Sequence, residues 1–258
     1  PLWLIMGGAV AVAIGLIVIN RVCEPVGGEA RPDIPLSIGE QTKKSWVFVT
    51  RDSRLYGLFL LLFLVFGGIL VTFAYVYNSV FAENLSGAEL TRFLALVNFV
   101  AVLFRTVLNL KFLSPLINRL GLANLLLIYP WGLFMLAFMV MVFPHSLYLA
   151  AALFIFHTFS FYSYVTVAGQ AMLGLVPKSL SQNVFFLIRG LSPSLAALVV
   201  SLLMAVMLAF CSNNPLSVEF TLFILAALTL AITLRIKKEY QKEVLRSLGI
   251  DDIYLKSN

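Results

Sequence analysis

Charged residues are scarce in this chain of 258 residues, in which Asp, Glu, Lys and Arg together make up only 12%. Soluble domains carry roughly a quarter charged residues, whereas here 61% of the residues are hydrophobic and the mean hydropathy is +0.98. The composition excludes an ordinary soluble domain and predicts a polytopic membrane protein. The net charge of +6 does not indicate nucleic-acid binding, because the basic residues lie at the ends of apolar segments and form no single stripe.

Cysteine and histidine are also rare, with two residues of each. Cys23 and Cys211 are expected on opposite sides of the membrane, where they cannot meet the geometry of a disulfide. The sequence has no metal-ligand spacing, no glycine-rich phosphate loop after a strand and no plausible Ser/His/Asp set. We therefore expect no metal, no cofactor and no enzymatic activity.

What the chain does have is long apolar segments, each able to cross a hydrocarbon core that takes about 20 helical residues. The expected fold is an all-α polytopic membrane protein with seven transmembrane helices. The predicted spans are residues 2–20, 54–77, 89–112, 122–143, 146–170, 183–210 and 216–236.

The spans are unevenly distributed, because a long polar connection separates the first from the other six. We predict a helix of a preceding bundle at 1–21, a cytoplasmic linker at 22–53, a six-helix bundle at 54–236 and a charged cytoplasmic tail at 237–258. Within the linker, "KKSWVFVTR" has the tryptophan and basic residues of a segment at the membrane interface. The first span is too long for a signal peptide and lacks its basic start, and the chain opens on Pro1 rather than methionine, so we expect a fragment or a processed product.

Lys and Arg occur in every second connection between the predicted spans. The first, third and fifth connections and the tail carry them, whereas "NSVFAENLSGAE", "FPHS" and "CSNNPLS" have none. By the positive-inside rule the N-terminus lies outside and the C-terminus in the cytoplasm. The basic residues used here are Arg21, Arg31, Lys43, Lys44, Arg51, Arg54, Lys111, Arg119, Lys178, Arg235, Lys237, Lys238, Lys242 and Arg246.

The connection between the second and third bundle helices contains "LSPLINRLGLANLLL", residues 113–127. It resembles a loop of the major facilitator superfamily that has a small residue, an apolar pair, a basic residue and glycine. The matching positions are Pro115, Leu116, Arg119 and Gly121, with Asn118 in place of the usual acidic residue. One helix, a long linker and six further helices also resemble the sixth helix, central loop and C-terminal half of such a transporter. The resemblance implies a gating role for Arg119 and Gly121.

The chain is most similar to the ATP:ADP antiporter-like branch, which includes bacterial proteins fused to HEAT-repeat or cyclic-nucleotide-binding domains. The segments that carry this resemblance are "RDSRLYGLFLL", "FAYVYNSVF", "AENLSGAELTRFLALVN", "NRLG", "LIYP" and "LVPKSLSQNVFFLIRGLSPSLAALV". It implies a bacterial inner-membrane protein that binds an anionic or nucleotide-like solute. It also implies a companion N-terminal half. Asn109 stands where the branch keeps a glutamine.

Polar residues within the predicted spans are the candidate binding residues. Thr91, Asn98, Arg105 and Asn109 are seven, seven and four residues apart, which places them on one helical stripe. An arginine at the bilayer centre costs several kcal/mol, so the stripe should face protein or a water-filled cavity. Arg105 either coordinates an anionic substrate or is a structural arginine paired with carbonyls or an acid.

The fifth span adds His157, Tyr164 and Gln170 as candidate substrate-binding residues. A membrane histidine is more often a packing residue than a proton carrier, and the serines and threonine nearby often link helices by hydrogen bonds. Arg189, Gly190 and Pro193 in the sixth span are candidate gating residues, since proline kinks a helix and glycine permits close approach. Arg189 could instead extend its side chain to the cytoplasmic interface.

No Asp or Glu is predicted deep in any span, so Arg105 has no acidic partner in view. This favours an anionic ligand, a counter-charge from a missing half or a wet cavity. One hypothesis is half of a secondary transporter. The other is a transport-inactive membrane scaffold or sensor, whose charged tail would lead to a soluble regulatory domain unless it is only a solvated helix end.

Overall fold

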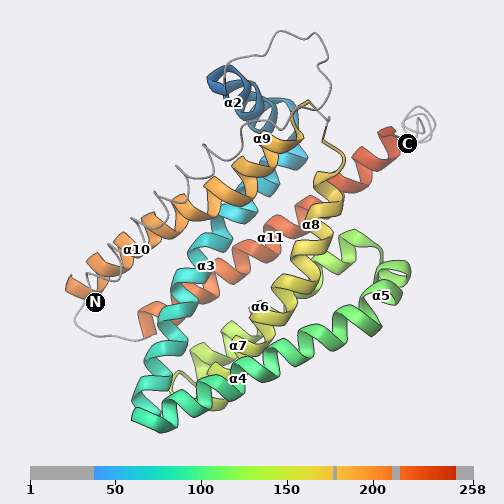
Figure 1. Ribbon diagram of the computed structural model, residues 1–258. Helices are drawn as coiled ribbons and strands as arrows, with labels where there is room; N and C mark the ends of the chain where they lie inside the picture. Colours follow the sequence, from blue (N-terminus) through green and yellow to red (C-terminus); the bar gives the residue numbers. More distant parts are fainter. Residues whose placement is uncertain (1–37, 177–178, 211–215, 248–258) are drawn as a thin grey trace. The chain divides into compact units, whose positions relative to one another are not determined.

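The computed structural model describes residues 38–176, 179–210 and 216–247 (Figure 1). Contacts divide the chain after Ser37, and the described elements belong to the unit Ile38–Asn258. Its elements are α2 (Ile38–Val47), η1 (Phe48–Asp52), α3 (Arg54–Asn84), α4 (Gly87–Val107), η2 (Leu108–Phe112), α5 (Leu113–Leu120), α6 (Leu122–Val142), α7 (Leu147–Ser160), η3 (Phe161–Val165), α8 (Thr166–Leu173), α9 (Ser181–Phe185), η4 (Phe186–Leu191), α10 (Ser192–Phe210) and α11 (Leu216–Ser247), where η denotes a π-helical segment. The all-α prediction is confirmed over these ranges.

Six helices in the described ranges are long and apolar enough to cross a membrane, which is the construction of an integral membrane protein. They are Arg54–Asn84, Gly87–Leu120, Leu122–Val142, Leu147–Leu173, Ser181–Ala205 and Val218–Leu245. Each corresponds to one of the six spans predicted after residue 53. The predicted first span, most of the linker, both cysteines, Lys178 and the end of the tail lie outside the described residues.

The helices extend beyond the apolar segments that predicted them. α3 continues to Asn84, so only Leu85 and Ser86 separate it from α4. At the other end of α4, the chain stays helical through η2 and α5 as far as Leu120. Gly121, with a φ of 76°, then separates α5 from α6. The connection predicted at 113–121 is therefore helical from Leu113 to Leu120 and ends at one glycine, whose missing side chain permits that backbone conformation.

The predicted linker and tail also contain helix. The linker is helical from Ile38, and α11 extends eleven residues beyond the predicted end of its span, from 236 to Ser247. Helical hydrogen bonds join backbone groups only, so a helix continues past its apolar part wherever the side chains are good helix formers. The Lys- and Glu-rich sequence after Ile236 satisfies that condition.

α3 is the most buried of the six spans and packs against α10, α11 and α7. Its core side chains include Phe59, Phe66 and Ile69. Phe66 meets the rings of Tyr129 and Phe161 edge to face, at centroid distances of 5.5 Å. Such edge-to-face pairs are favourable because the ring edge is positive and the ring face negative.

Gly67 sets the distance between α3 and α10. A Cβ at this position would overlap the carbonyl oxygen of Pro193 and lie 2.8 Å from its Cα. Small residues allow this kind of close backbone approach between membrane helices. Beside the crossing, the Ser192 hydroxyl donates a hydrogen bond to the carbonyl of Leu60 at 3.0 Å. The crossing of α3 and α10 holds η4, the segment that carries Arg189, against α3.

Candidate functional site

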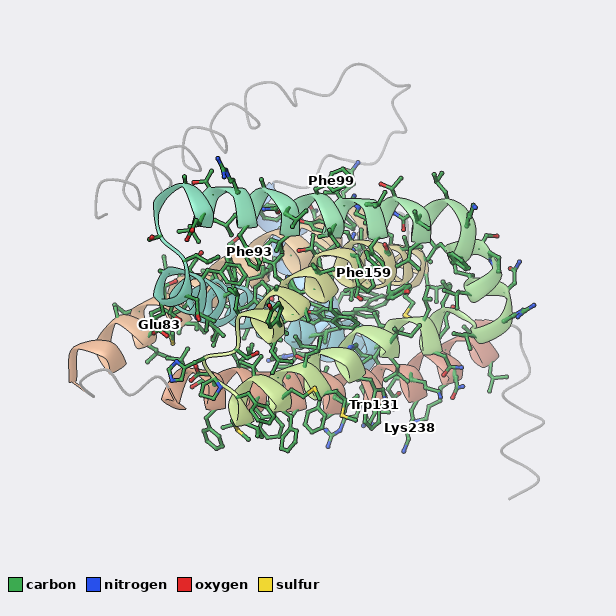
Figure 2. All side chains as sticks on the ribbon, turned by 90° about the horizontal axis from the view of Figure 1, so that it is seen from below. Glu83, Phe93, Phe99, Trp131, Phe159 and Lys238 are labelled. Atoms are coloured by element: carbon green, nitrogen blue, oxygen red, sulfur yellow. The ribbon has the colours of Figure 1, made fainter. Side chains whose placement is uncertain are left out.

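The predicted stripe on α4 lies on an exposed surface of the described bundle. Only 11% of the most apolar window of Gly87–Leu120 is buried, and Asn98, Arg105 and Asn109 are all exposed. The Asn98 side-chain amide donates to the carbonyl of Leu94 at 2.9 Å. Figure 2 shows α4 along one edge of the bundle, with Phe99 pointing away from it. This differs from the interior orientation that we expected for the stripe.

Arg105 contacts an aromatic ring of the neighbouring helix. Its guanidinium carbon lies 4.6 Å from the centroid of the Tyr162 ring, which is itself 48% exposed. One residue earlier, Phe104 stacks on Phe159 with a centroid distance of 5.9 Å. These two contacts hold α4 against the segment from α7 to η3. No hydrogen bond or ion pair engages Arg105 within the described ranges, so its N–H donors remain available to a ligand.

Arg189 occupies a different environment, which we call the Arg189 site. Its Nη2 donates to the carbonyl oxygen of Thr166 at 3.0 Å, and its guanidinium carbon lies 5.4 Å from the Phe63 ring and 5.3 Å from the Phe185 ring. Gly169 lies beside the guanidinium, and a Cβ there would make an ordinary van der Waals contact with Nη2 at 3.6 Å. Arg189 therefore links the α9–η4 segment to α8 and α3, and its side chain is half-buried among them.

The Arg189 site lies next to two π-helical segments. Arg189 lies within η4, and Thr166 is the first residue after η3. The Thr166 hydroxyl donates to the carbonyl of Phe161, five residues earlier, at 3.2 Å. π-helical turns insert an extra residue into a helix and are frequent at functional sites. At this site a guanidinium and a backbone carbonyl that are 23 residues apart in the sequence are joined by a hydrogen bond.

His157 lies in the aromatic core of the bundle. It is 7% exposed, and its Nδ1 is 2.8 Å from the hydroxyl of Tyr129. The Phe73 ring lies 4.6 Å from the imidazole, and Phe161 stacks on it at 5.7 Å. The hydroxyl and rings satisfy the histidine as a packing residue, which is the alternative that sequence patterns favour for a membrane histidine.

The other candidates on this helix divide between core and surface. Tyr164 is 6% exposed, whereas Gln170 is exposed on α8. Ser160 and Ser163 are fully buried, and their hydroxyls have no hydrogen-bond partner among the described residues. The structure therefore does not bring His157, Tyr164 and Gln170 together on one surface.

Comparison with protein-family models, curated proteins and solved structures finds no match. Within the described ranges, no group of three His, Cys, Asp or Glu side chains is arranged to hold a metal ion.

The candidate gating residues lie in two places. Arg119 is exposed in the last turn of α5, directly before Gly121. Gly190 lies in η4, where a Cβ would be 3.2 Å from the Phe186 ring. Pro193 is in the first turn of α10, at the crossing with Gly67. Arg189, Gly190 and Pro193 thus form one segment against α3, whereas Arg119 and Gly121 stand apart from it.

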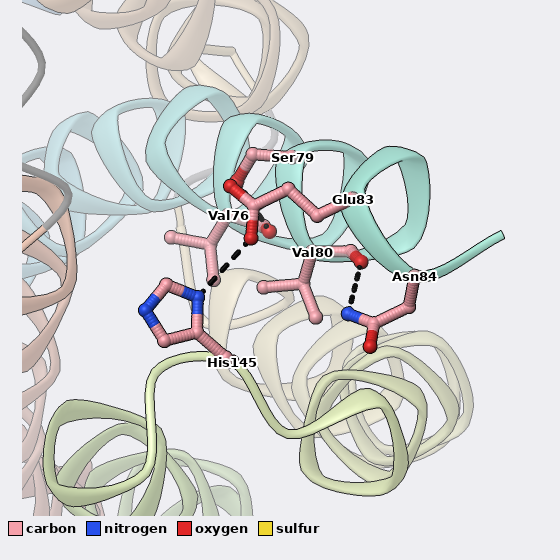
Figure 3. A network of polar contacts seen from close by, with 6 residues as sticks. All are labelled: Val76, Ser79, Val80, Glu83, Asn84 and His145. Atoms are coloured by element: carbon pink, nitrogen blue, oxygen red, sulfur yellow. Dashed lines mark hydrogen bonds and ion pairs between the residues drawn. The ribbon is translucent and has the colours of Figure 1, made fainter.

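Acidic groups gather at one end of the bundle. Glu83 Oε2 and His145 Nδ1 are 3.1 Å apart, and both side chains are more than half exposed (Figure 3). Glu219 is only 4% exposed, with Oε2 unpartnered among the described residues. The sequence places no Asp or Glu deep in a predicted span, but it did not predict that Glu219 is enclosed by protein.

Sequence reasoning missed the partners of the polar candidates. Tyr129, Tyr162 and Thr166 each contact a predicted site residue from another helix or segment. Nothing in the sequence identified the arginine that Tyr162 or Thr166 would meet. These contacts depend on which helices are neighbours, and helical spacing along one segment does not contain that information.

Proposed function

We propose that the chain is half of a major-facilitator-type secondary transporter, which moves an anionic or nucleotide-like solute by alternating access. The observation that carries the proposal is the exposed Arg105 guanidinium. It is placed over the Tyr162 ring, on a membrane-spanning helix that the bundle leaves mostly uncovered. An arginine in that position faces water or protein, because exposure to lipid costs several kcal/mol.

In this proposal a companion bundle provides the protein or water-filled surface that Arg105 must face. Secondary transporters bind their solute near the bilayer midplane between two repeats, and each repeat presents polar groups to the other. Asn98, Arg105 and Asn109 form such a polar stripe on α4. In this proposal the stripe lines the space between the bundle and a companion N-terminal half. The guanidinium then offers its planar donors to a carboxylate or phosphate.

The same arrangement favours transport over catalysis. An anion held by one arginine and neighbouring amides is bound weakly enough to be released on the other side, and no catalytic set is needed. The proposed location is the bacterial inner membrane, with the N-terminus outside and the C-terminus in the cytoplasm. The gathering of Arg54, Arg235 and Lys238 around one cleft at a single end of the bundle supports this orientation.

A second candidate function is a transport-inactive membrane scaffold or sensor. The observation that favours it is α11, which continues as a charged helix to Ser247, well beyond its apolar part. A helix that leaves the membrane in this way can connect rigidly to a soluble regulatory domain. The two candidates differ in whether anion flux exists at all.

The test is uptake or exchange of labelled nucleotides and other small anions in proteoliposomes containing the complete protein. Arg105→Ala should lower flux by at least about tenfold, which corresponds to roughly 1.4 kcal/mol of lost anion binding. Arg92→Ala is the matched control, since Arg92 is exposed on the same helix three to four turns away. Flux of no anion, or flux that Arg105→Ala leaves intact, would contradict the proposal.

A further inference from the structure

A cleft of about 510 Å³ lies between the start of α3 and the charged part of α11. It is lined by Arg54, Gly57 and Leu58 from α3 and by Arg235, Lys238 and Glu239 from α11. Three basic side chains from helices far apart in the sequence therefore meet around one space. Nothing in the proposed transport site uses them.

The cleft carries unbalanced positive charge. Its one carboxylate, Glu239, already binds Lys242, with Oε1 and Nζ 2.8 Å apart. In the part of the chain that the structure describes, no ion pair engages Arg54, Arg235 or Lys238. In addition, α3 begins at Arg54 with no side-chain hydrogen bond capping its N-terminus, which adds the partial positive charge of the helix end. The group that fits this cleft is a phosphate or another compact anion.

Apolar surface continues from the cleft toward the middle of the membrane. On α3, Leu61 and Leu64 follow Leu58 at helical spacing and are each 45% exposed. On α11, Leu228 and Ile224 lie seven and eleven residues before Arg235 on the same helical face, and both are exposed. α3 and α11 pack together over their length. A ligand with an anionic head and apolar tails matches both parts of this surface.

We propose that the cleft binds the phosphate-bearing headgroup of an anionic phospholipid. The acyl chains lie along the exposed leucines of α3 and α11. Basic pockets between membrane helices are suited to such headgroups, because the arginines reach the phosphate while the helices below contact the tails. A free phosphate would use the basic groups but leave the apolar stripes without a role. The lipid stabilises the α3–α11 pair at the basic end of the bundle.

The experiment measures lipid retention by native mass spectrometry and the thermal unfolding midpoint, on the full chain in mild detergent. The probes are dioleoyl phosphatidylglycerol, dioleoyl phosphatidylcholine and inorganic phosphate at matched concentrations. The test variant is Arg54→Gln with Arg235→Gln. Lys44→Gln with Lys237→Gln is the control, which removes the same charge from basic residues that do not line the cleft.

The wild type and the control should retain phosphatidylglycerol in preference to phosphatidylcholine, and the test variant should lose about thirtyfold of that preference. Lys238→Glu, a change at an exposed side chain, gives the same comparison if the double variant fails to fold. Equal retention in the test variant, or an equal loss in the control, overturns the proposal. Stabilisation by inorganic phosphate as large as that by phosphatidylglycerol would assign the cleft to a free anion and reject the lipid.

Discussion

Arg105 and Arg189 are both arginines of membrane-spanning helices, and the bundle surrounds them in different ways. Arg189 is half-buried, donates to the Thr166 carbonyl at 3.0 Å and lies near two phenylalanine rings. Arg105 is exposed and has a single aromatic contact, the Tyr162 ring at 4.6 Å. The folded chain itself thus provides partners for one arginine, and leaves the donors of the other available.

We interpret this difference as one between a structural role for Arg189 and a binding role for Arg105. A charged group inside a membrane protein is stabilised by protein partners, by water or by a ligand. Arg189 has protein partners on three helical segments, so we expect it to stabilise the fold. Arg105 lacks hydrogen-bonding partners among the described residues, so its environment is completed by something outside them. The proposal of an anionic solute therefore rests on Arg105, and Arg189 is expected to act through the position of α10.

The largest effect is expected when the close approach that positions Arg189 is removed. Gly67→Leu places a side chain where Pro193 already lies, so α3 and α10 must separate. We expect a loss of about 3 kcal/mol in unfolding free energy, at the upper end of overpacking effects. The measurement is denaturant unfolding in mild detergent, followed by circular dichroism.

Gly67→Leu should disturb the Arg189 site and leave the contact between Arg105 and Tyr162 intact. Ala82→Leu is the control, because Ala82 is exposed on the same helix away from the crossing. An unfolding free energy that matches wild type for Gly67→Leu would show that α3 and α10 do not cross as described.

Substitution of the two arginines themselves should give an intermediate effect that differs between them. Arg189→Leu loses a charged hydrogen bond to Thr166 and the contacts with two rings, so we expect about 2 kcal/mol of lost stability. Arg105→Leu should change stability by less than about 1 kcal/mol, since it loses only one ring contact. The same unfolding measurement checks both.

Arg189→Lys keeps the charge and sharpens the comparison. Lysine cannot reproduce the planar donor of the guanidinium, so it should recover only part of the stability. If Arg105→Leu proves more destabilising than Arg189→Leu, the assignment of a structural role to Arg189 and a binding role to Arg105 is reversed.

Much of the fold could be predicted from the sequence, because long apolar segments identify the membrane spans. The predicted starts at 54 and 122 coincide with the first residues of α3 and α6, where Ser53 and Gly121 interrupt the helix. The ends were less well predicted. α3 continues to Asn84 and α11 to Ser247, because polar and charged residues extend a helix as readily as apolar ones.

For the candidate site, the sequence predicted which residues share a face of one helix. It did not predict which residues of other helices they contact. Spacing placed Asn98, Arg105 and Asn109 on one stripe, and all three share an exposed surface. The expectation that this stripe faces an interior assumed neighbours that the described bundle does not provide. The contact of His157 with Tyr129, across 28 residues, likewise depends on the packing of α6 against α7.

The smallest expected effect concerns the ring that distinguishes Arg105 from a freely solvated arginine. Tyr162→Leu removes the cation–π contact and should lower stability by about 0.5 to 1 kcal/mol, the usual value at an exposed site. Tyr162→Phe keeps the ring face and should behave as wild type. In the transport assay, Tyr162→Leu should weaken apparent anion affinity without abolishing flux, because the guanidinium remains but is less well positioned. If Tyr162→Phe impairs transport as much as Tyr162→Leu, then the hydroxyl, and not the ring beneath Arg105, is the group that matters.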